Sequence, residues 1–345
     1  MFPAAWRLTE RNQINMDKIL LLTTGGTIMS EPSDRGYTPT LSGPEITKYL
    51  GPIRGDVEVQ TKNILQLDSS NIQPEEWQLI ARSIDDSFRQ FDGVVVTHGT
   101  DTMAYTASML SYMLRNIPVP IVLTGSQLPI WHPLSDAPGN LACAFAMAAN
   151  RRPGVFVAFD HAVILGTRAV KVRTTGFHAF ESINYPYVGT IDSNGLVVND
   201  SVLPNASGAY TLSDRLETKV ALMKIVPGFN PELLERLLDM KYRGVVVEAF
   251  GIGGMHFIRR NLVEELGKLV KNGISVVVCS QCLYEKSDFS VYETGRGALE
   301  NGVIPGQDMT TEAAITKLMW VLGQTDEPDA IRRTFTMNIA GEIFE

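Results

Sequence analysis

The chain has 345 residues, of which 44% are hydrophobic and 20% charged, a composition typical of a soluble globular protein with room for two cores. Its formal net charge of −8 disfavours a nucleic acid or a membrane surface as the main partner, because both attract concentrated Lys and Arg. No apolar stretch approaches the roughly 18 residues that a membrane span requires.

The first 17 residues are polar and unpatterned. They lack the long apolar stretch and the small-residue cleavage site of a secretory signal. This absence, together with an odd count of three cysteines that predicts reduced thiols, favours a cytoplasmic protein. We expect the segment either to be disordered or to reflect a translation start at Met16 instead of Met1, since Met16 directly precedes the first predicted strand.

The first predicted strand covers residues 18–24 and leads into a turn that ends at Thr27. The stretch is apolar throughout, as in a buried strand. The turn has the sequence Gly-Gly-Thr, and its two glycines allow the backbone to bend sharply and to approach a ligand closely. Residues 29–40 are rich in Ser, Pro, Gly and charge, which predicts a surface loop. Its one aromatic residue, Tyr37, either folds over the Thr27 turn or anchors the loop.

A second polar turn follows a strand predicted at residues 57–65. This turn contains Asp68, Ser69 and Ser70, and it precedes a helix predicted over residues 74–89. The helix begins with proline, which is favoured in a first turn. Hydroxyl-bearing residues therefore follow a strand here, as Thr27 does.

A third polar turn follows residues 93–96, a short apolar run with β-branched side chains that predicts a buried strand. Thr100 and Asp101 lie in this turn, and residues 103–114 are predicted to be helical with Asp101 or Thr102 as the N-cap. The carboxyl end of a strand is the usual ligand position in an open α/β sheet, and a helix start offers free N–H groups to an anion. Capping alone would explain one such turn, but the repetition favours a shared site.

Strands and helices continue to alternate after this turn. A fourth polar turn, Gly125-Ser126-Gln127, follows the next strand. The spacing predicts βαβ units in a doubly wound, mainly parallel sheet. The predicted elements are strands at residues 121–124, 155–159 and 162–165, and a helix at residues 139–150.

Residues 166–180 carry three basic side chains among apolar and small ones. Charged side chains usually face solvent, and we predict this for Arg168 and Arg173. Lys171 lies between two valines, where burial beside a carboxylate is plausible. Its spacing alone does not decide between a structural and a functional role.

A second α/β unit is predicted after residues 194–218, whose Gly, Ser, Asn and Asp content indicates a linker. We therefore expect a larger N-terminal domain at 18–205, a linker at 206–218 and a smaller C-terminal α/β domain at 219–345. The elements predicted in the second domain are strands at residues 220–226, 244–248 and 275–279 and helices at 231–238, 260–271, 311–322 and 329–336.

Several kinds of chemistry lack their sequence signals. The five histidines are dispersed, and Cys279 and Cys282 form a lone CxxC pair, so neither a metal nor a cofactor is expected. Gly-rich phosphate-binding fingerprints and a Gly-x-Ser-x-Gly elbow are also absent. Covalent catalysis by a threonine hydroxyl remains, which needs a base or a lysine–carboxylate pair and backbone N–H groups for the oxyanion. On this reasoning, Thr27 and Thr100 are equal candidates for the nucleophile.

Two long motifs resemble the signatures of the bacterial-type L-asparaginase family, in particular its cytoplasmic type I branch. They are LLLTTGGTI at residues 20–28 and HGTDTMAYTAS at residues 98–108. The resemblance extends from residue 18 to the C-terminus and implies cofactor-independent hydrolysis of L-asparagine to L-aspartate and ammonia. Further matching stretches are LDSSNIQPEEW (67–77), TGSQLP (124–129) and GTRAVKVRTTGFHAFESINYP (166–186).

The resemblance also implies catalytic roles. Thr27 matches the primary nucleophile, which attacks the side-chain amide carbon and forms an acyl-enzyme. Tyr37 matches the loop tyrosine that supports this threonine. Thr100, Asp101 and Lys171 match a second group that resembles a catalytic triad. In that group the lysine assists Thr100, which activates the incoming water or takes part in acyl transfer.

Substrate-binding roles follow from the same resemblance. Asp101 and Ser69 match the residues that hold the α-ammonium and α-carboxylate of the substrate, and Asp68, Ser70 and Thr100 lie beside them. This agrees with the chemistry of the side chains, because a carboxylate suits an ammonium and a hydroxyl near a helix start suits a carboxylate.

The implied partners are L-asparagine and further copies of the chain, without nucleic acid or membrane. The family forms homodimers, often dimers of dimers, with sites between the N-terminal domain of one chain and the C-terminal domain of the other. Some type I members have a regulatory asparagine site in the turn that holds Cys282. This chain departs from them at Glu248, where a regulatory arginine can occur.

Three alternatives to an asparaginase stay open. A glutaminase-asparaginase would act on a substrate that is longer by one methylene. An asparaginase-like subunit of an archaeal tRNA amidotransferase would need a partner protein. A catalytically silent protein would bind asparagine without hydrolysing it.

Overall fold

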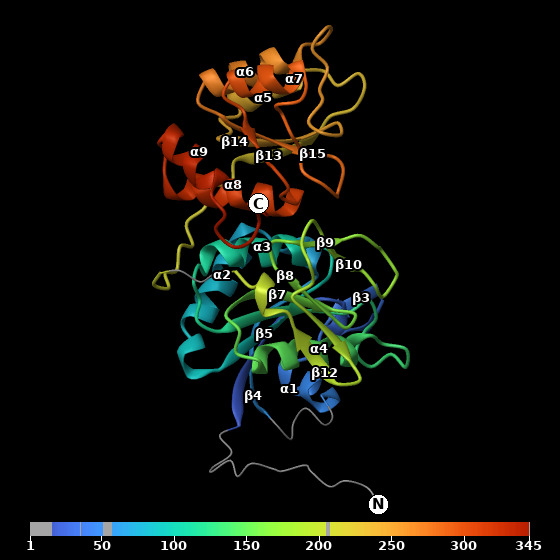
Figure 1. The fold of residues 1–345 in the computed structure, drawn as a ribbon. Coiled ribbons are helices and arrows are strands. Elements are labelled where there is room, and N and C mark those ends of the chain that lie inside the picture. Colours follow the sequence, from blue (N-terminus) through green and yellow to red (C-terminus); the bar gives the residue numbers. More distant parts are fainter. Residues whose placement is uncertain (1–15, 35, 51–56, 205–207, 345) are drawn as a thin grey trace, which may run out of the picture.

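The protein is described by a computed structural model that covers residues 16–34, 36–50, 57–204 and 208–344 (Figure 1). The disorder or alternative start predicted for residues 1–17 therefore lies outside the described residues, except for Met16 and Asp17. Within the described part of the chain, no helix is both long enough and apolar enough to cross a membrane.

The larger sheet lies in the N-terminal part of the chain. Its strands are β1 (Asp17–Gly25), β4 (Val57–Leu67), β5 (Gly93–Thr97), β6 (Pro120–Thr124), β7 (Gly154–Phe159), β8 (Ala162–Leu165), β11 (Gly189–Asp192) and β12 (Gly195–Val198). In the described residues they form an eight-stranded sheet in the order β12-β11-β8-β7-β6-β5-β1-β4. The strands from β4 to β7 pair in parallel, and β8, β11 and β12 extend the sheet in antiparallel fashion. The predicted mainly parallel sheet is confirmed.

Helices cover both faces of this sheet. Successive residues of β1 point to opposite faces: Leu20 and Leu22 pack with α2 (Pro74–Asp85) and α3 (Met103–Met113). Ile19 and Leu21 pack in the other cluster, with the short helix α1 (Gly43–Ile46) and with α4 (Ala137–Ala149). Because both faces are buried at the centre of the sheet, strands β5, β6 and β7 read as apolar runs in the sequence, without alternation.

The C-terminal part contains a smaller parallel sheet of four strands among the described residues, in the order β13-β14-β15-β16. Helices α5, α6 and α7 pack on its outer face, and α8 lies between this sheet and the N-terminal part (Figure 1). The expected smaller C-terminal α/β domain is confirmed, although β16 and α7 were not predicted. The bounds are β13 (Val220–Lys224), β14 (Gly244–Ala249), β15 (Ser275–Ser280), β16 (Ile304–Pro305), α5 (Glu232–Asp239), α6 (Leu262–Lys271), α7 (Glu293–Glu300), α8 (Thr311–Gln324) and α9 (Pro328–Thr336).

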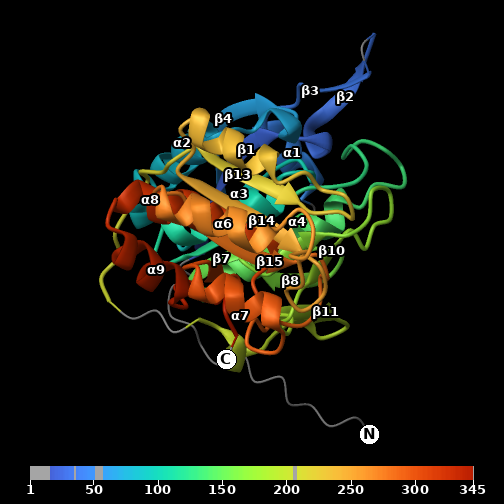
Figure 2. The same ribbon diagram turned by 90° about the horizontal axis from the view of Figure 1, so that it is seen from above.

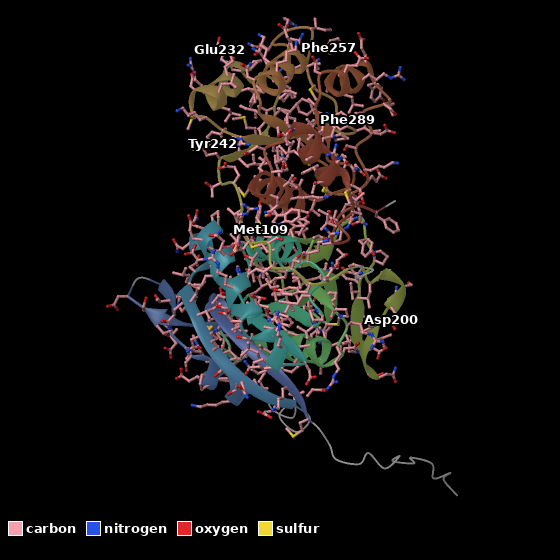
Figure 3. All side chains as sticks on the ribbon, turned by 90° about the vertical axis from the view of Figure 1, so that its left-hand side faces the viewer. Met109, Asp200, Glu232, Tyr242, Phe257 and Phe289 are labelled. Carbon is pink, nitrogen blue, oxygen red and sulfur yellow. The ribbon has the colours of Figure 1, made fainter. Side chains whose placement is uncertain are left out.

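The two parts share one hydrophobic core. Helix α8 packs on α3, where the rings of Tyr112 and Trp320 stack with centroids 6.0 Å apart. The Tyr112 hydroxyl donates a hydrogen bond to the Ala313 carbonyl at 3.2 Å. Met109 of α3 is fully buried at this junction (Figure 3). A single apolar cluster therefore runs from β1 through α3 and α8 to β14.

Two hairpins outside the two larger sheets and several short 3-10 helices complete the described structure. Residues predicted as an irregular loop form β2 (Ser30–Ser33) and β3 (Gly36–Pro39), an antiparallel hairpin that projects from the body of the molecule (Figure 2). A second hairpin of β9 (Ala169–Lys171) and β10 (Phe180–Ser182) was not predicted. The short 3-10 helices are η1 (Thr27–Met29), η2 (Thr47–Tyr49), η4 (Ser69–Asn71), η5 (Phe88–Gln90) and η6 (Asp200–Val202).

Candidate active site

Glycines bring three of the predicted polar turns into direct contact. Gly26 has a φ of +81°, and a Cβ placed on it would lie 2.4 Å from the backbone nitrogen of Gly99. A Cβ on Gly99 would in turn lie 2.6 Å from Oγ of Ser69. No side chain fits in either place, because heavy atoms cannot approach so closely. The turns that carry Thr27, Ser69 and Thr100 therefore meet at the carboxyl ends of β1, β4 and β5.

Lys171 lies against the third turn. Its Nζ donates hydrogen bonds to Oγ1 of Thr100 at 2.7 Å and to Oδ1 of Asp101 at 2.5 Å. Thr100 is buried, and the Lys171 side chain is only 17% exposed, whereas the carboxylate of Asp101 is 63% exposed. Lys171 is therefore partly buried beside a carboxylate, the environment that its position between two valines suggested. The arrangement leaves one face of the Asp101 carboxylate open to solvent, where a small cation can reach it.

Helix α3 is not capped by the side chains that the sequence suggested. Thr102 is its N-cap residue but makes no capping hydrogen bond, and its Oγ1 donates instead to the Ser69 carbonyl at 2.8 Å. The carboxylate of Asp101 instead accepts a hydrogen bond from Nζ of Lys171. Capping therefore does not explain the polar residues of this turn.

Ser69 is buried between its neighbours, and it is anchored through two hydrogen bonds. Besides the bond from Thr102, its Oγ accepts the backbone N–H of Asp101 at 3.3 Å. The hydroxyl hydrogen of Ser69 remains available to a ligand, because Oγ acts as the acceptor in that contact.

Asp68 and Ser70 are turned toward each other. Oδ1 of Asp68 accepts the backbone N–H of Ser70 at 2.9 Å and the Ser70 hydroxyl at 2.5 Å. Both residues are exposed, and this closed pair shapes the turn that presents Ser69.

Thr27 begins η1, and the structure leaves it half-buried at the junction of the turns. Tyr37 lies on β3 of the projecting hairpin and is 59% exposed. Its ring lies beside that of Trp131, with centroids 6.4 Å apart. Tyr37 is thus not a buried anchor, and it lies on strand β3, which packs against η1, the short helix that Thr27 begins.

Gln127, in the fourth polar turn, is a contact of Thr100 that was not among the predicted site residues. Its Oε1 accepts a long hydrogen bond from Oγ1 of Thr100 at 3.5 Å. Its Nε2 donates to the carbonyls of Thr174 and Gly176 at 3.2 and 3.1 Å, which orients the amide. Its position after β6 was the signal in the sequence that could have indicated a site residue. Its side chain is an uncharged amide, however, and therefore gave no reason to select it as one.

The loop that contains Gln127 also reaches the first turn. The backbone N–H of Ile130 donates to the Ile28 carbonyl at 3.3 Å, next to Thr27. Nε1 of Trp131 donates to the carbonyl of Ser30 at 2.8 Å, at the base of the hairpin. One loop therefore touches both threonine turns.

His98 lies beneath the site and is fully buried. Nδ1 is 2.7 Å from the Gly99 carbonyl oxygen, and Nε2 is 2.9 Å from Oγ1 of Thr106. Burial lowers the pKa of His98 to about 4, so the ring is neutral at physiological pH. The sequence indicated only that this histidine follows a strand.

Arg168 corrects a prediction from the sequence. It was expected to face solvent, but its side chain is fully buried. Its Nη1 is 2.9 Å from Oδ2 of Asp308, and its Nε donates to the Gly341 carbonyl at 2.7 Å. Both partners are more than 100 residues away in the chain, which is why local sequence gave no signal of them. Arg173 is exposed, as predicted, and pairs with Glu181 at 2.8 Å.

Glu248, at the position of the possible regulatory arginine, lies in the C-terminal part. Its Oε1 accepts the hydroxyl of Thr311 at 2.7 Å, and its Oε2 is 3.7 Å from Nζ of Lys224. Cys282 is exposed, with its thiol free. In the described residues, no group of three or more His, Cys, Asp or Glu side chains is placed to hold a metal ion.

Comparison with known proteins matches nearly the whole chain. The family described as "Asparaginase, N-terminal" matches residues 18–203, and "Glutaminase/Asparaginase C-terminal domain" matches residues 219–335. The L-asparaginase of Thermococcus kodakarensis is 45% identical over 328 residues, which are 94% of this chain and 99% of that protein. The structure of the thermostable enzyme from the same organism superposes with a TM-score of 0.90 at 44% identity, over 95% of this chain and 99% of that one.

Two further relatives are less similar in sequence. L-asparaginase I from Vibrio cholerae has a TM-score of 0.85 at 29% identity, and the similarity covers 96% of this chain and all of that one, 100%. A glutamyl-tRNA(Gln) amidotransferase subunit of Thermococcus kodakarensis is 36% identical over 340 residues. These are 95% of this chain but 77% of that relative.

Proposed function

This chain belongs to the asparaginase family, and from that membership we propose that it is an L-asparagine amidohydrolase that acts through a threonine acyl-enzyme. One observation carries the proposal. The Nζ of Lys171 reaches both Thr100 at 2.7 Å and Asp101 at 2.5 Å, in a turn that packs against the Gly26–Thr27 turn. A second hydroxyl, a lysine and a carboxylate are thereby assembled beside the first hydroxyl.

Substrate binding in this proposal uses the charges of an α-amino acid. The exposed carboxylate of Asp101 attracts the α-ammonium group. The hydroxyl of Ser69 donates to the α-carboxylate, since its oxygen already accepts the N–H of Asp101. The side-chain amide then extends toward Thr27.

Acylation begins with attack of the Thr27 hydroxyl oxygen on the amide carbon. A C–O bond forms, the C–N bond breaks, and the threonine proton leaves with the nitrogen as ammonia. Because the oxyanion of the intermediate needs preorganised donors, we assign this role to the backbone N–H groups of the touching glycine turns. The product of this half-reaction is a Thr27 aspartyl ester.

Deacylation in the proposal uses the second group. Thr100, held by the hydrogen bond from Nζ of Lys171, accepts a hydrogen bond from the attacking water and directs the water oxygen at the ester carbon. Nζ of Lys171 also donates to the Asp101 carboxylate at 2.5 Å, which holds the lysine in place against Thr100. A C–O bond forms between the water oxygen and the acyl carbon, the C–O bond to Thr27 breaks, and the water proton passes through Thr100 to the departing Thr27 oxygen, so that aspartate and the Thr27 hydroxyl are released.

The test is ammonia release from L-asparagine and L-glutamine by the purified protein and by two variants. Thr27→Ala removes the proposed nucleophile, and Thr190→Ala removes an exposed threonine on β11 as a matched control. We expect turnover by the wild type and the control, and a loss of at least about 10³-fold in kcat for Thr27→Ala. Near-normal turnover by Thr27→Ala would exclude the proposed nucleophile.

A glutaminase-asparaginase is a second candidate, favoured by the description of the matching C-terminal domain. Glutamine is longer by one methylene, and a pocket discriminates such a difference by roughly 1–3 kcal/mol, which is about 10- to 200-fold. Comparable kcat/KM values on the two amides would assign the chain to this activity.

A component of a tRNA amidotransferase is a third candidate, because a relative of that kind is 36% identical. Such a component would need its partner before releasing ammonia productively. Turnover of free asparagine by this chain alone argues against that role. Silence on both amides, with heat released when asparagine binds, would instead indicate a catalytically silent asparagine-binding protein.

Assembly and location complete the proposal. We propose a homodimer, or a dimer of dimers, in the cytoplasm. Sedimentation velocity at micromolar concentration measures the assembly. A stable monomer with full activity would contradict the proposed homodimer.

A further inference from the structure

A buried chain of hydrogen bonds ends at the backbone of the Thr100 turn. Nε1 of Trp77 on α2 donates to Oγ1 of Thr106 on α3 at 3.0 Å. Thr106 is in turn 2.9 Å from Nε2 of His98, and Nδ1 of His98 is 2.7 Å from the carbonyl oxygen of Gly99. Trp77, Thr106 and His98 are all buried, and none of them lies in the proposed mechanism.

The two ends of this chain determine where its hydrogens lie. An indole N–H can only donate, and a peptide carbonyl can only accept. A neutral imidazole has one donor and one acceptor nitrogen. The consistent arrangement has Trp77 donating to Thr106, the Thr106 hydroxyl donating to Nε2, and Nδ1–H donating to the Gly99 carbonyl. Every polar group in the chain is then satisfied, as buried groups require.

The bond to Gly99 restrains a whole peptide unit. Because the peptide between Gly99 and Thr100 is planar and trans, a carbonyl that points at the imidazole directs the Thr100 N–H to the opposite side. Among the hydrogen bonds of the described residues, that N–H has no acceptor. Gly26 packs against Gly99, so the N–H lies in the turn that adjoins Thr27.

The same peptide unit also sets the position of the Thr100 side chain. Its hydroxyl must remain 2.7 Å from Nζ of Lys171 and within reach of Gln127 at 3.5 Å. A rotation of the peptide plane would move both the N–H and the hydroxyl, since both groups are attached at Thr100. Such a change in orientation reduces the rate of catalysis, because a hydrogen-bond donor stabilises a transition state only when it points at the atom where charge develops.

We propose that His98 is a positioning residue for the proposed hydrolysis: through Nδ1–H it holds the Gly99 carbonyl and thereby orients the N–H and hydroxyl of Thr100. The inference rests on the proposed function. The proposal assigns the effect on catalysis to Nδ1 and not to Nε2. A variant that keeps only one of the two nitrogens can therefore distinguish positioning of Thr100 from general support of the fold.

The test uses two substitutions that each keep one nitrogen. In His98→Asn, the side-chain amide occupies the place of Nδ1 and can still donate to Gly99. In His98→Gln, the amide occupies the place of Nε2 and can bond only to Thr106. Each variant loses one buried hydrogen bond, so a purely structural role would affect both alike.

We expect kcat on asparagine to fall by roughly 10- to 100-fold in His98→Gln, with KM changed by less than about threefold. In His98→Asn, kcat is expected to stay within about threefold of the wild type. Thr106→Val breaks the other end of the chain but keeps Nδ1–H on Gly99, so its kcat is also expected to stay near the wild-type value. Urea unfolding of all variants checks that they are folded at the assay temperature.

Equal losses of kcat in the Asn and Gln variants, or a larger loss in Thr106→Val than in His98→Gln, would overturn the proposal. Nitrogen-15 NMR of the wild-type imidazole gives a readout that needs no turnover: an Nε2–H tautomer at pH 7 would overturn it as well. If the wild-type protein has the expected tautomer but releases no ammonia, the proposed function is contradicted. The hydrogen bond between His98 and Gly99 would still be established in that case.

Discussion

At the scale of the residue, two basic side chains in the same segment have opposite environments. Arg168 is fully buried and bonds to Asp308 and to the Gly341 carbonyl, whereas Lys171 borders the site and bonds to Asp101. Neither environment can be read from the two residues that separate them, Ala169 and Val170. Each cation is placed where a carboxylate offsets the cost of removing it from water.

A second residue, Glu312, makes stability depend on pH. It lies in the first turn of α8, and burial, together with the nearby charge of Glu248, raises its pKa from 4.5 to about 7. A carboxyl group with a raised folded-state pKa holds its proton more tightly in the folded than in the unfolded chain. The stabilisation is therefore complete below pH 4.5 and is lost as pH rises to about 7.

We predict that the free energy of unfolding falls between pH 5 and pH 7.5 by up to about 3 kcal/mol from this group, at about 1.4 kcal/mol per pH unit. Glu312→Gln cannot ionise and should flatten that part of the profile, so that the variant exceeds the wild type in stability at pH 8. Urea unfolding across this range measures the effect, with the exposed Glu293→Gln as control. A wild-type profile with the same slope as that of Glu312→Gln would contradict the assignment.

At the scale of the element, the hairpin β2–β3 is held to the body at its base. Nε1 of Trp131 donates to the Ser30 carbonyl at 2.8 Å, and its ring lies beside that of Tyr37. The residues were predicted as a loop because Ser, Pro and Gly dominate them. Cross-strand pairing of Ser30 with Pro39 and of Ser33 with Gly36 nevertheless closes a hairpin.

Trp131→Phe tests what this contact contributes. The phenyl ring retains the contact with Tyr37, while the hydrogen bond to Ser30 is lost at a cost of about 0.5–1.5 kcal/mol. If the closed hairpin supports catalysis, kcat/KM on asparagine falls by about two- to tenfold, and proteolysis within the hairpin becomes faster. His132→Ala, next in the chain but without a hydrogen bond to the described residues of the hairpin, should change neither. An unchanged kcat/KM together with faster cleavage would show that the hairpin is dispensable for turnover.

At the scale of the whole molecule, the C-terminal segment ties the two sheets together. After α9 the chain returns to the N-terminal part, where Ala340 and Gly341 carbonyls accept from Thr167 and Arg168. Phe344 donates its N–H to Asp308 at 3.1 Å. Together with the shared core of α3 and α8, these bonds couple the two sheets.

The ion pair of Lys317 and Glu342 is the most buried part of this closure. Both side chains are fully buried, with Nζ and Oε1 2.5 Å apart, and the Glu342 carboxylate also accepts the N–H groups of Ile339 and Ala340. Burial lowers the pKa of Lys317, although the charge of Glu342 opposes that effect. Each charge is therefore tolerated only because the other is present.

We predict that Lys317→Met lowers the free energy of unfolding by about 3–5 kcal/mol, because Glu342 is left as an unpaired buried charge. The double variant Lys317→Met with Glu342→Gln should recover more than half of that loss. Denaturant unfolding of the wild type, both single variants and the double variant forms a complete cycle. Equal stability of the single Lys317→Met variant and the double variant would contradict the argument.

Much of the architecture could be predicted because local patterns of apolar and polar residues specify the strands and helices. Apolar runs of strand length, alternating with helical stretches, indicated the parallel sheet and the second α/β unit. Polar turns after β1, β4 and β5 indicated where Thr27, Ser69 and Thr100 lie, because carboxyl ends of parallel strands share one edge. The family motifs then singled out Lys171, which spacing alone had left undecided.

The tertiary structure decided what depends on partners far along the chain. It placed Gln127 against Thr100, the His98 imidazole under Gly99, Arg168 against Asp308, and Tyr37 beside Trp131. The physical reason is that period and turn chemistry act over a few residues, whereas burial of a charge or a hydrogen-bonding group is set by whatever the fold brings beside it. The sequence alone determined the family, the sheet and the edge where the hydroxyls gather; only the folded chain determined which groups orient them.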